Sequence, residues 1–340
     1  MKARALVPVG GFFVAALLAL PAGVLAQGGG GGGAGGGGED GAGGGSVGQK
    51  PAKISVKLKG VDGGRVDVGD RVRAIGKVRP FVGGQEVEVR LGRKGDVVEK
   101  KTPFVRRVKN KNYGRVKLKS KPLVKAGKYR VRVSKAPTPQ QAGGRAKSQQ
   151  FRLRFPDLDP GDSGPAVALF NDLLRKRGYY SSGGNGYSSR TGRAVMAFRK
   201  VNGMARNFQA TPGIFQALAA GKGSFKLRYP NAGRHVEVDL SKQVMVLAGA
   251  DGKPQWTFHV STGTIATPSD QGGYSFYRRE PGYNNVRMYY SVYYNGGEAI
   301  HGYHSVPPHP ASHGCIRNPI PDSVFIYNWV ELGMKIWVYN

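Results

Sequence analysis

The sequence predicts a multidomain, mainly β chain that holds an N-terminal β-sandwich, a small three-helix domain and a C-terminal β-rich domain. The length of 340 residues exceeds what one hydrophobic core usually serves, so more than one domain is expected. Apolar residues alternate with polar ones through residues 53–155 and again after residue 225, which is the period of half-buried strands. Between these stretches the apolar period becomes helical.

Residues 1–26 have the pattern of a signal peptide. Lys2 and Arg4 precede the apolar run 12–20, and small residues up to Ala26 offer a cleavage site. Because the run is shorter than the ~20 residues that a membrane span needs, we expect cleavage and export to the cell wall or periplasmic space. The alternative is an uncleaved N-terminal anchor, which would be the only membrane contact.

Residues 27–50 are predicted to be a Gly-rich linker. Positions 28–45 hold 14 glycines, a composition that cannot bury enough surface to offset the chain entropy lost on folding. This segment therefore predicts a tether between the exported N-terminus and the folded domains.

Residues 51–156 predict a basic β-sandwich-like domain. Ile54, Val56 and Leu58 alternate with lysines, and the same period returns at 87–91, 116–118, 129–133 and 151–155. Gly-rich turns such as 61–64 separate these stretches, as in a small antiparallel sandwich.

Most of the net charge of +31 lies in this domain. Residues 50–155 hold 31 Lys and Arg against 7 Asp and Glu, whereas residues 223–340 hold 10 against 8. A surface this cationic attracts polyanions, and for an exported chain we expect anionic wall polymers as partners. The alternative is a solvated positive face without a fixed partner. No nucleic-acid-binding motif is present, so nucleic acid is not a predicted partner.

Residues 157–222 predict three short helices. Asp162 or Ser163 can cap the first, Thr191 opens the second, and Thr211 followed by Pro212 opens the third. The stretches 161–167, 178–180 and 194–200 resemble the three-helix peptidoglycan-binding domain of many wall enzymes. The resemblance implies wall binding, and it departs from the usual form at 206–209, where a tight glycine turn is more common. A helical spacer is the alternative, since a fold does not fix a function.

Residues 225–340 predict a β-rich domain that carries the chemistry. Strands are expected at 236–240, 244–246 and 256–260, followed by a helix at 322–332 and a closing strand at 335–339. Polar and glycine residues gather late in this stretch in one motif: His301, Gly302, Ser312, His313, Gly314, Cys315 and Arg317.

This motif holds the parts of thiol catalysis. An imidazole that accepts the proton of Cys315, the only cysteine, is expected to raise the thiolate fraction at neutral pH. Gly314 lets the backbone bend, so that its N–H and that of Cys315 can point at a developing oxyanion. A cysteine nucleophile with His301 as general base is the hypothesis that follows.

The same motif resembles that of the YkuD-type L,D-transpeptidase catalytic domain, over residues 225–340. Upstream, 261–263 and 267–268 are similar to the family's strand and turn before the cover of its active site. The resemblance implies that Cys315 is acylated, that His301 is the base, and that the Gly302 carbonyl orients the imidazole.

The resemblance further implies that the amides of His313, Gly314 and Cys315 form the oxyanion hole. Ser312 would hold the loop, and Arg317 would lie beside the carboxylates of the substrate. Two departures bear on the substrate loop and the cover: only ten residues separate His301 from Ser312, and Asp270-Gln271-Gly272 enlarges the turn.

The activity implied by the resemblance is a peptidoglycan L,D-transpeptidase that forms 3→3 cross-links between stem peptides and releases the terminal D-alanine. It also implies acylation by carbapenems. If water resolves the thioester, the enzyme is an L,D-carboxypeptidase; a non-catalytic wall-binding protein is the alternative of another class.

Neither a cofactor nor a metal is expected. Five possible zinc ligands lie close together in the sequence: His301, His304, His309, His313 and Cys315. Their spacing matches no familiar zinc signature, and no carboxylate is placed as a general base, so a zinc hydrolase is disfavoured.

Overall fold

The computed structural model describes residues 51–340, in which strands far outnumber helices. The predicted signal peptide (1–26) and Gly-rich linker (27–50) lie outside the described residues. Within residues 51–340, no helix has the length and apolar character needed to cross a membrane. The prediction of a mainly β chain is therefore confirmed for the described part.

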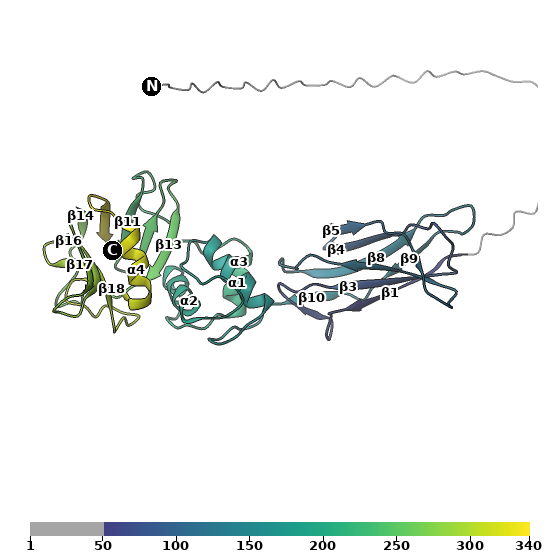
Figure 1. Ribbon diagram of the computed structural model, residues 1–340, viewed down its shortest axis with the longest axis horizontal. Helices are drawn as coiled ribbons and strands as arrows, with labels where there is room; N and C mark the ends of the chain where they lie inside the picture. Colours follow the sequence, from purple (N-terminus) through teal and green to yellow (C-terminus); the bar gives the residue numbers. More distant parts are fainter. Residues whose placement is uncertain (1–50) are drawn as a thin grey trace, which may run out of the picture. The chain divides into compact units, whose positions relative to one another are not determined.

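Two facing sheets built from ten strands make up residues 51–156 (Figure 1). One sheet has the order β1-β3-β7-β6; the other has the order β2-β10-β8-β4-β5, with β9 paired to β8. The strands are β1 (Lys53–Lys59), β2 (Arg65–Asp67), β3 (Arg73–Arg79), β4 (Glu88–Arg93), β5 (Asp96–Lys101), β6 (Arg106–Arg107), β7 (Gly114–Lys119), β8 (Lys128–Lys135), β9 (Gly144–Lys147) and β10 (Phe151–Arg154).

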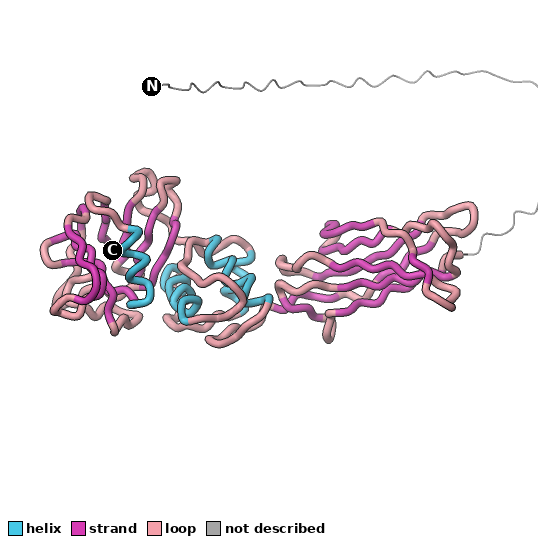
Figure 2. The backbone as a smooth tube through the Cα atoms, in the orientation of Figure 1, coloured by secondary structure: helices cyan, strands magenta, loops and turns pink. Residues whose placement is uncertain are grey.

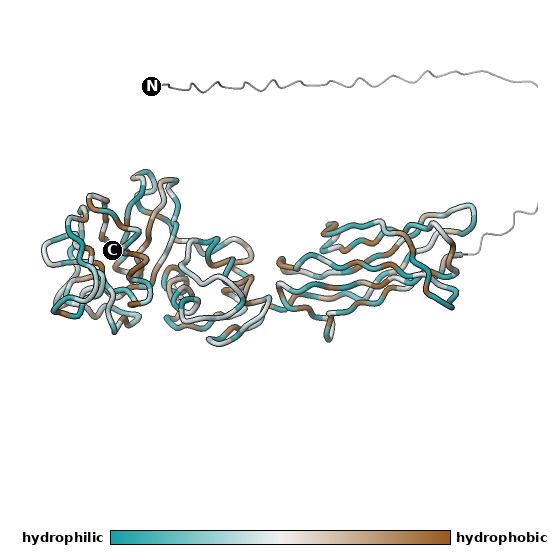
Figure 3. The backbone as a smooth tube through the Cα atoms, in the orientation of Figure 1, coloured by the Kyte–Doolittle hydropathy of each residue, from teal (hydrophilic) through white to brown (hydrophobic). Residues whose placement is uncertain are grey.

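One core joins the two sheets. Val78 of β3, Leu91 of β4 and Val133 of β8 are all buried in it. Along each of these strands, buried positions alternate with more exposed ones. Figure 3 shows this alternation as brown and teal segments along the strands. The period-two pattern of the sequence therefore records which face of each strand is buried.

Three helices follow: α1 (Pro165–Lys176), α2 (Ser189–Val201) and α3 (Pro212–Ala219) (Figure 2). The predicted cap of α1 is wrong, because the N-cap is Gly164 without a side-chain bond, and the Asp162 carboxylate accepts the N–H of Asp159 instead. For α2, Ser188 is the cap and its hydroxyl accepts the N–H of Thr191.

A second core fills the space between these helices. Phe170 of α1, Phe198 of α2 and Phe215 of α3 are fully buried there, and the rings of Phe170 and Phe215 meet edge to face. Val68 and Phe155, which flank strands of the preceding sheets, belong to the same core. The helical core therefore begins before residue 157.

The remaining residues form two further sheets and one helix. The sheets have the orders β13-β12-β11-β19-β14 and β15-β16-β17-β18, and α4 packs against the second of them. The elements are β11 (His235–Asp239), β12 (Val244–Ala248), β13 (Pro254–His259), β14 (Gly272–Ser275), β15 (Arg278–Tyr283), β16 (Tyr289–Asn295), β17 (Glu298–Tyr303), β18 (Ile316–Pro319), α4 (Ile320–Trp329) and β19 (Lys335–Tyr339).

The helices and the last sheets share polar and aromatic contacts. Arg193 of α2 binds Asp322 of α4 through two hydrogen bonds, Nε to Oδ2 and Nη2 to Oδ1, each of 2.7 Å. Tyr180, just after α1, stacks on Phe325 with ring centroids 4.4 Å apart. A backbone bond from Thr257 of β13 to Gly178 adds to this contact. The helices therefore brace the sheets that hold the candidate site.

Candidate active site

Two parallel strands carry or flank the predicted site residues. β17 carries His301, and β18 begins directly after Cys315, with His301 paired to Arg317 in the register. Cys315 packs against a cluster that includes Ala299, which lies two positions before His301 on β17. Strand residues two positions apart point to the same side, so the thiol lies on the side of β17 that carries His301. Backbone bonds between Ser261 and Arg317, both of 2.9 Å, hold the other edge of β18.

The His301 imidazole is held in one tautomer. Its Nδ1 lies 3.0 Å from the carbonyl oxygen of Gly302, which can only accept, so Nδ1 carries the proton and Nε2 keeps a free lone pair. Burial lowers the pKa of His301 to about 4, and the positive charge of Arg317 adds to this decrease. The hydrogen bond to the Gly302 carbonyl opposes it but is the smaller effect. The ring is therefore neutral at pH 7 and able to accept a proton.

The Cys315 thiol is half-buried, and its Sγ lies 3.7 Å from the carbonyl oxygen of Gly297. Burial raises the pKa of this thiol, and the negative charge of Glu298 raises it further. A backbone contact with Ala299 and the positive charge of Arg317 lower the pKa, but by less than burial raises it. Thiol and imidazole thus both favour their neutral forms. The structure disagrees with the sequence-based expectation of an increased thiolate fraction, because burial outweighs the nearby positive charge.

Ser312 organises the loop that carries the thiol. Its hydroxyl donates to the Cys315 carbonyl at 2.6 Å and accepts the N–H of Gly314 at 3.2 Å. The N–H of Gly314 is therefore directed at Ser312, whereas the sequence predicted that it points at a developing oxyanion. His313, the residue between them, has an exposed side chain.

Gly314 needs its lack of a side chain. Its φ is +115°, and a Cβ added there would lie 2.9 Å from Oε1 of Glu298. Both facts disfavour any other residue at this position. Glu298 also accepts the N–H of Asp270 at 3.1 Å. The Glu298 carboxylate therefore binds the turn at 270–272 and leaves no room for a side chain at Gly314.

The segment 261–272 lies along the catalytic loop. The Thr262 carbonyl accepts the N–H groups of Ala311 and Ser312, each at 2.9 Å, and the hydroxyl of Ser269 donates to the Gly314 carbonyl. Ile265, between these contacts, is fully exposed. Sequence reasoning missed Ser269 and Glu298, because their partners lie far away in the chain and no motif marks them.

Arg317 braces the short loop between the two halves of the motif. Its Nη1 donates to the Ala311 carbonyl at 2.9 Å, and its guanidinium carbon lies 4.1 Å from the centroid of the Tyr303 ring. Arg206 of the helical module donates to the carbonyl of Pro308 in the same loop. Two arginines, Arg317 and Arg206, thus bind backbone carbonyls of the ten-residue loop between His301 and Ser312.

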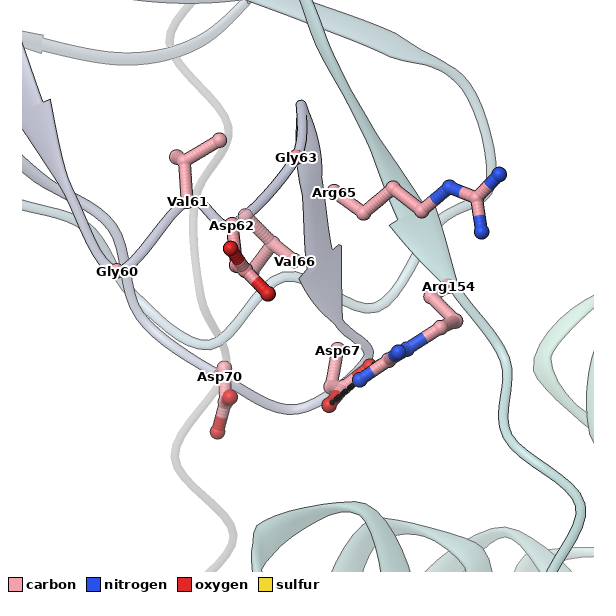
Figure 4. Close-up of a pocket in the computed structure, with 9 residues that line it drawn as sticks. All are labelled: Gly60, Val61, Asp62, Gly63, Arg65, Val66, Asp67, Asp70 and Arg154. Carbon is pink, nitrogen blue, oxygen red and sulfur yellow. Dashed lines mark hydrogen bonds and ion pairs between the residues drawn. The ribbon is translucent and has the colours of Figure 1, made fainter.

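A separate hollow lies in the N-terminal sheets (Figure 4). It has a volume of about 590 Å³, and the paired side chains of Arg154 and Asp67 lie at its rim. None of the predicted site residues lines it. Within residues 51–340, no group of three or more His, Cys, Asp or Glu could hold a metal ion.

Comparisons with known proteins identify the domain that holds these residues. Residues 233–338 match the family model of the L,D-transpeptidase catalytic domain, YkuD. The crystal structure of an L,D-transpeptidase from Xylanimonas cellulosilytica is 28% identical, covers 55% of this chain and 98% of its own, and has a TM-score of 0.50.

Two other solved structures are similar at lower scores. An L,D-transpeptidase from Stackebrandtia nassauensis is 24% identical over 54% of this chain and 95% of its own, with a TM-score of 0.35. One from Mycobacterium smegmatis is 12% identical over 85% of this chain and 100% of its own, with a TM-score of 0.29. A search of curated proteins finds no match. Residues 233–338 of this chain form a YkuD L,D-transpeptidase catalytic domain.

Proposed function

We propose that this chain is an exported peptidoglycan L,D-transpeptidase that forms 3→3 cross-links through a thioester on Cys315 and releases the terminal D-alanine. The observation that carries the proposal is the packing of Cys315 against the cluster that includes Ala299, two positions before His301 on β17. The Nδ1 of that imidazole is held by Gly302 and its Nε2 is free. The match to the L,D-transpeptidase family supports stem peptides as the substrate class.

The first step starts from a neutral pair. As Sγ of Cys315 attacks the carbonyl carbon of the third stem residue, Nε2 of His301 takes the thiol proton. The new C–S bond pushes an electron pair onto the carbonyl oxygen. Because the Gly314 N–H already bonds Ser312, we assign the stabilising contacts to the N–H groups of His313 and Cys315.

Collapse of this intermediate gives the thioester. The C–N bond to D-alanine breaks, and the leaving nitrogen takes the proton from the His301 imidazolium. His301 is then neutral again and can serve the second half of the reaction.

The second step transfers the acyl group. The side-chain amine of another stem attacks the thioester carbon and gives its proton to His301, the C–S bond breaks, and the thiolate recovers that proton. Arg317 supplies positive charge for the carboxylates of the substrate. If water attacks in place of the amine, the same steps give an L,D-carboxypeptidase.

The remaining modules fit a wall enzyme. The helical residues 157–222 would bind peptidoglycan, as their resemblance implies, and the predicted signal peptide would export the chain. A non-catalytic wall-binding protein is the alternative, and an intact Cys315 together with a His301 ring held by the Gly302 carbonyl argues against it.

Acylation by a carbapenem tests the nucleophile. The purified chain should gain the mass of one drug molecule, and a chelator should not change this. Cys315→Ala should gain nothing, whereas Ser305→Ala, an exposed change in the neighbouring loop, should react as the parent does. An unmodified parent protein would favour the non-catalytic alternative.

Product analysis on a disaccharide-tetrapeptide then separates transferase from hydrolase. The transpeptidase gives dimers joined between third residues, together with free D-alanine. Tripeptide without any dimer would establish the carboxypeptidase instead.

A further inference from the structure

The outward face of the sheet β1-β3-β7-β6 consists mainly of cations. β1, β3 and β7 each contribute three Lys or Arg and β6 contributes Arg106, and none of the four strands holds an acidic residue. We call this surface the cationic face: Lys53, Lys57, Lys59, Arg73, Lys77, Arg79, Arg106, Arg115, Lys117 and Lys119. Except for Lys77, which is half-buried, all of them are exposed.

The register places like charges side by side. Arg73 lies between Lys59 on one neighbouring strand and Lys119 on the other. In another row, Arg115 pairs with both Lys77 and Arg106. Like charges directly opposite each other destabilise a sheet, so these rows have a cost in the free protein.

No carboxylate relieves this repulsion. None of the ion pairs found within residues 51–340 includes a residue of the cationic face. The other sheet of the same module differs, because Glu88 there pairs with both Arg90 and Lys100. The strands of that sheet are also positive, with 13 Lys or Arg against four Asp or Glu. What distinguishes the cationic face is therefore that its strands hold no carboxylate, which favours a negatively charged partner on that side.

One end of the cationic face is already organised around an aromatic ring. Lys77, Arg79 and Arg115 surround Tyr113, with their charged groups 5.0 to 5.5 Å from the ring centroid. The ring fixes where these charges point. A hollow of about 720 Å³ opens beside it, lined partly by Lys53 and Arg79.

We propose that the cationic face binds a linear phosphodiester polymer of the cell wall. Cations recur every ~6.6–6.8 Å along β7, whereas Ser55 interrupts the series on β1 and Ile75 interrupts it on β3. In the row of Lys59, Arg73 and Lys119 they lie ~4.8 Å apart across the sheet, so successive phosphates of a flexible chain can each meet Lys or Arg. The choice of a wall polymer rests on the proposed function, which places the chain among such polymers.

Two other partners fit this face less well. A membrane surface usually takes apolar side chains together with cations, but none of the large exposed hydrophobic residues of 51–340 lies on β1, β3, β6 or β7. Single-stranded nucleic acid stacks its bases on aromatic rings, and the ring of Tyr113 is already in contact with three cations.

The test compares two variants of the full chain that lose the same charge. The first carries Lys59→Gln, Arg73→Gln and Lys119→Gln, one row of the cationic face. The control carries Arg90→Gln, Lys100→Gln and Arg132→Gln, a row on the other sheet. Binding of purified poly(glycerol phosphate) is measured at several salt concentrations by isothermal titration calorimetry or light scattering.

We expect the first variant to bind the polymer at least about 10-fold more weakly at 150 mM salt. Its slope of log Kd against log salt should fall by about 2, as expected for three lost phosphate contacts at ~0.7 each. The control should lose less than about 2-fold. Equal losses in both variants would show that only the net charge matters and would overturn the proposal.

Two further arms separate the sources of failure. Tighter binding of anionic lipid vesicles or single-stranded DNA than of the polymer would overturn the choice of partner. Cys315→Ala should keep polymer binding, and the first variant should keep its carbapenem adduct. Failure of the proposed enzyme activity and failure of the cationic face are thus seen in different measurements.

Discussion

The Nζ atom of Lys200, on α2, lies 3.3 Å from Nδ1 of His259, on β13. The same ammonium donates to the carbonyl oxygens of Val260 at 2.8 Å and Gln243 at 3.0 Å, and only 3% of Lys200 is exposed. Burial lowers the pKa of Lys200 to about 7, with a further contribution from the charge of Arg206. The helical module thus places a titratable amine inside the frame of the catalytic domain.

Lys200→Met should destabilise the protein by about 1–3 kcal/mol, because it leaves the buried Val260 and Gln243 carbonyls without a donor. Lys222→Met, at an exposed lysine, should change the free energy of unfolding by less than about 0.5 kcal/mol. Urea titration of both variants measures the difference. Equal stabilities would contradict the contact.

The same lysine should make stability depend on pH. Its pKa is about 7 in the folded protein, against 10.5 for a lysine in water, so the unfolded chain binds more protons between these values. Unfolding free energy should therefore rise with pH from about 7 to 9.5, by at most about 1.4 kcal/mol per pH unit from this group. The slope should be smaller in Lys200→Met. Since the other groups that titrate in this range are common to both proteins, the difference between the two curves isolates Lys200.

Breaking the ion pair of Arg193 and Asp322 should cost about 3–5 kcal/mol, because either partner would remain as an unpaired buried charge. The side chain of Asp322 is only 3% exposed. A double-mutant cycle with Arg193→Ala and Asp322→Ala should show a strong coupling. The exposed pair of Arg175 and Asp172 is the control and should couple by less than about 1 kcal/mol. Similar coupling in both pairs would argue against a buried pair.

Gly314→Ala should slow carbapenem acylation by about 100-fold or more, since the loop must shift to accommodate the new Cβ and a displacement of ~1 Å is enough for such a loss. Stopped-flow or mass-spectrometric kinetics can follow the reaction. Gly83→Ala is the control, because a Cβ there meets nothing within 4 Å and its φ is not positive. Adding Glu298→Ala to Gly314→Ala should restore the rate only in part, because the positive φ remains unfavourable. A full-speed Gly314→Ala enzyme would contradict the role of this turn.

The acylation rate should be nearly constant from about pH 5 to pH 8 and fall towards pH 4. Burial lowers the pKa of His301 to about 4, and protonation of this base in the free enzyme stops proton transfer from the thiol. His304→Gln, in the exposed loop, should have the same profile. Circular dichroism at each pH would show that the protein stays folded. An apparent pKa near 6.5 would indicate an imidazole in water and contradict this assignment.

Much of the architecture could be predicted because it depends on local patterns. Alternation at Ile54, Val56 and Leu58 predicted a strand, and the structure has β1 at Lys53–Lys59. Pro212 after Thr211 predicted the start of α3. The end of α4 was less accurate: the helix runs from Ile320 to Trp329, whereas 322–332 was expected, because Val330 adopts an extended conformation.

The site divides in the same way. The motif around His301 and Cys315 predicted the family of residues 233–338, which the comparison confirms. The contacts of Glu298 and Ser269 with Gly314 could not be predicted, since they join segments that are 16 and 45 residues apart. The protonation states depend on burial, which belongs to the folded chain.

By itself the sequence determined the succession of a β-rich, a helical and a second β-rich stretch, the surplus of positive charge in residues 50–155, and the residues that make up the thiol motif. Only the tertiary structure decided that some of those charges share the cationic face without a carboxylate, and that thiol and imidazole favour neutral forms. The physical reason is that the spacing of apolar and polar residues, which determines strands and helices, involves residues close together in the chain. Electrostatic energies, in contrast, depend on distance and solvent exposure, which exist only once distant segments have packed together.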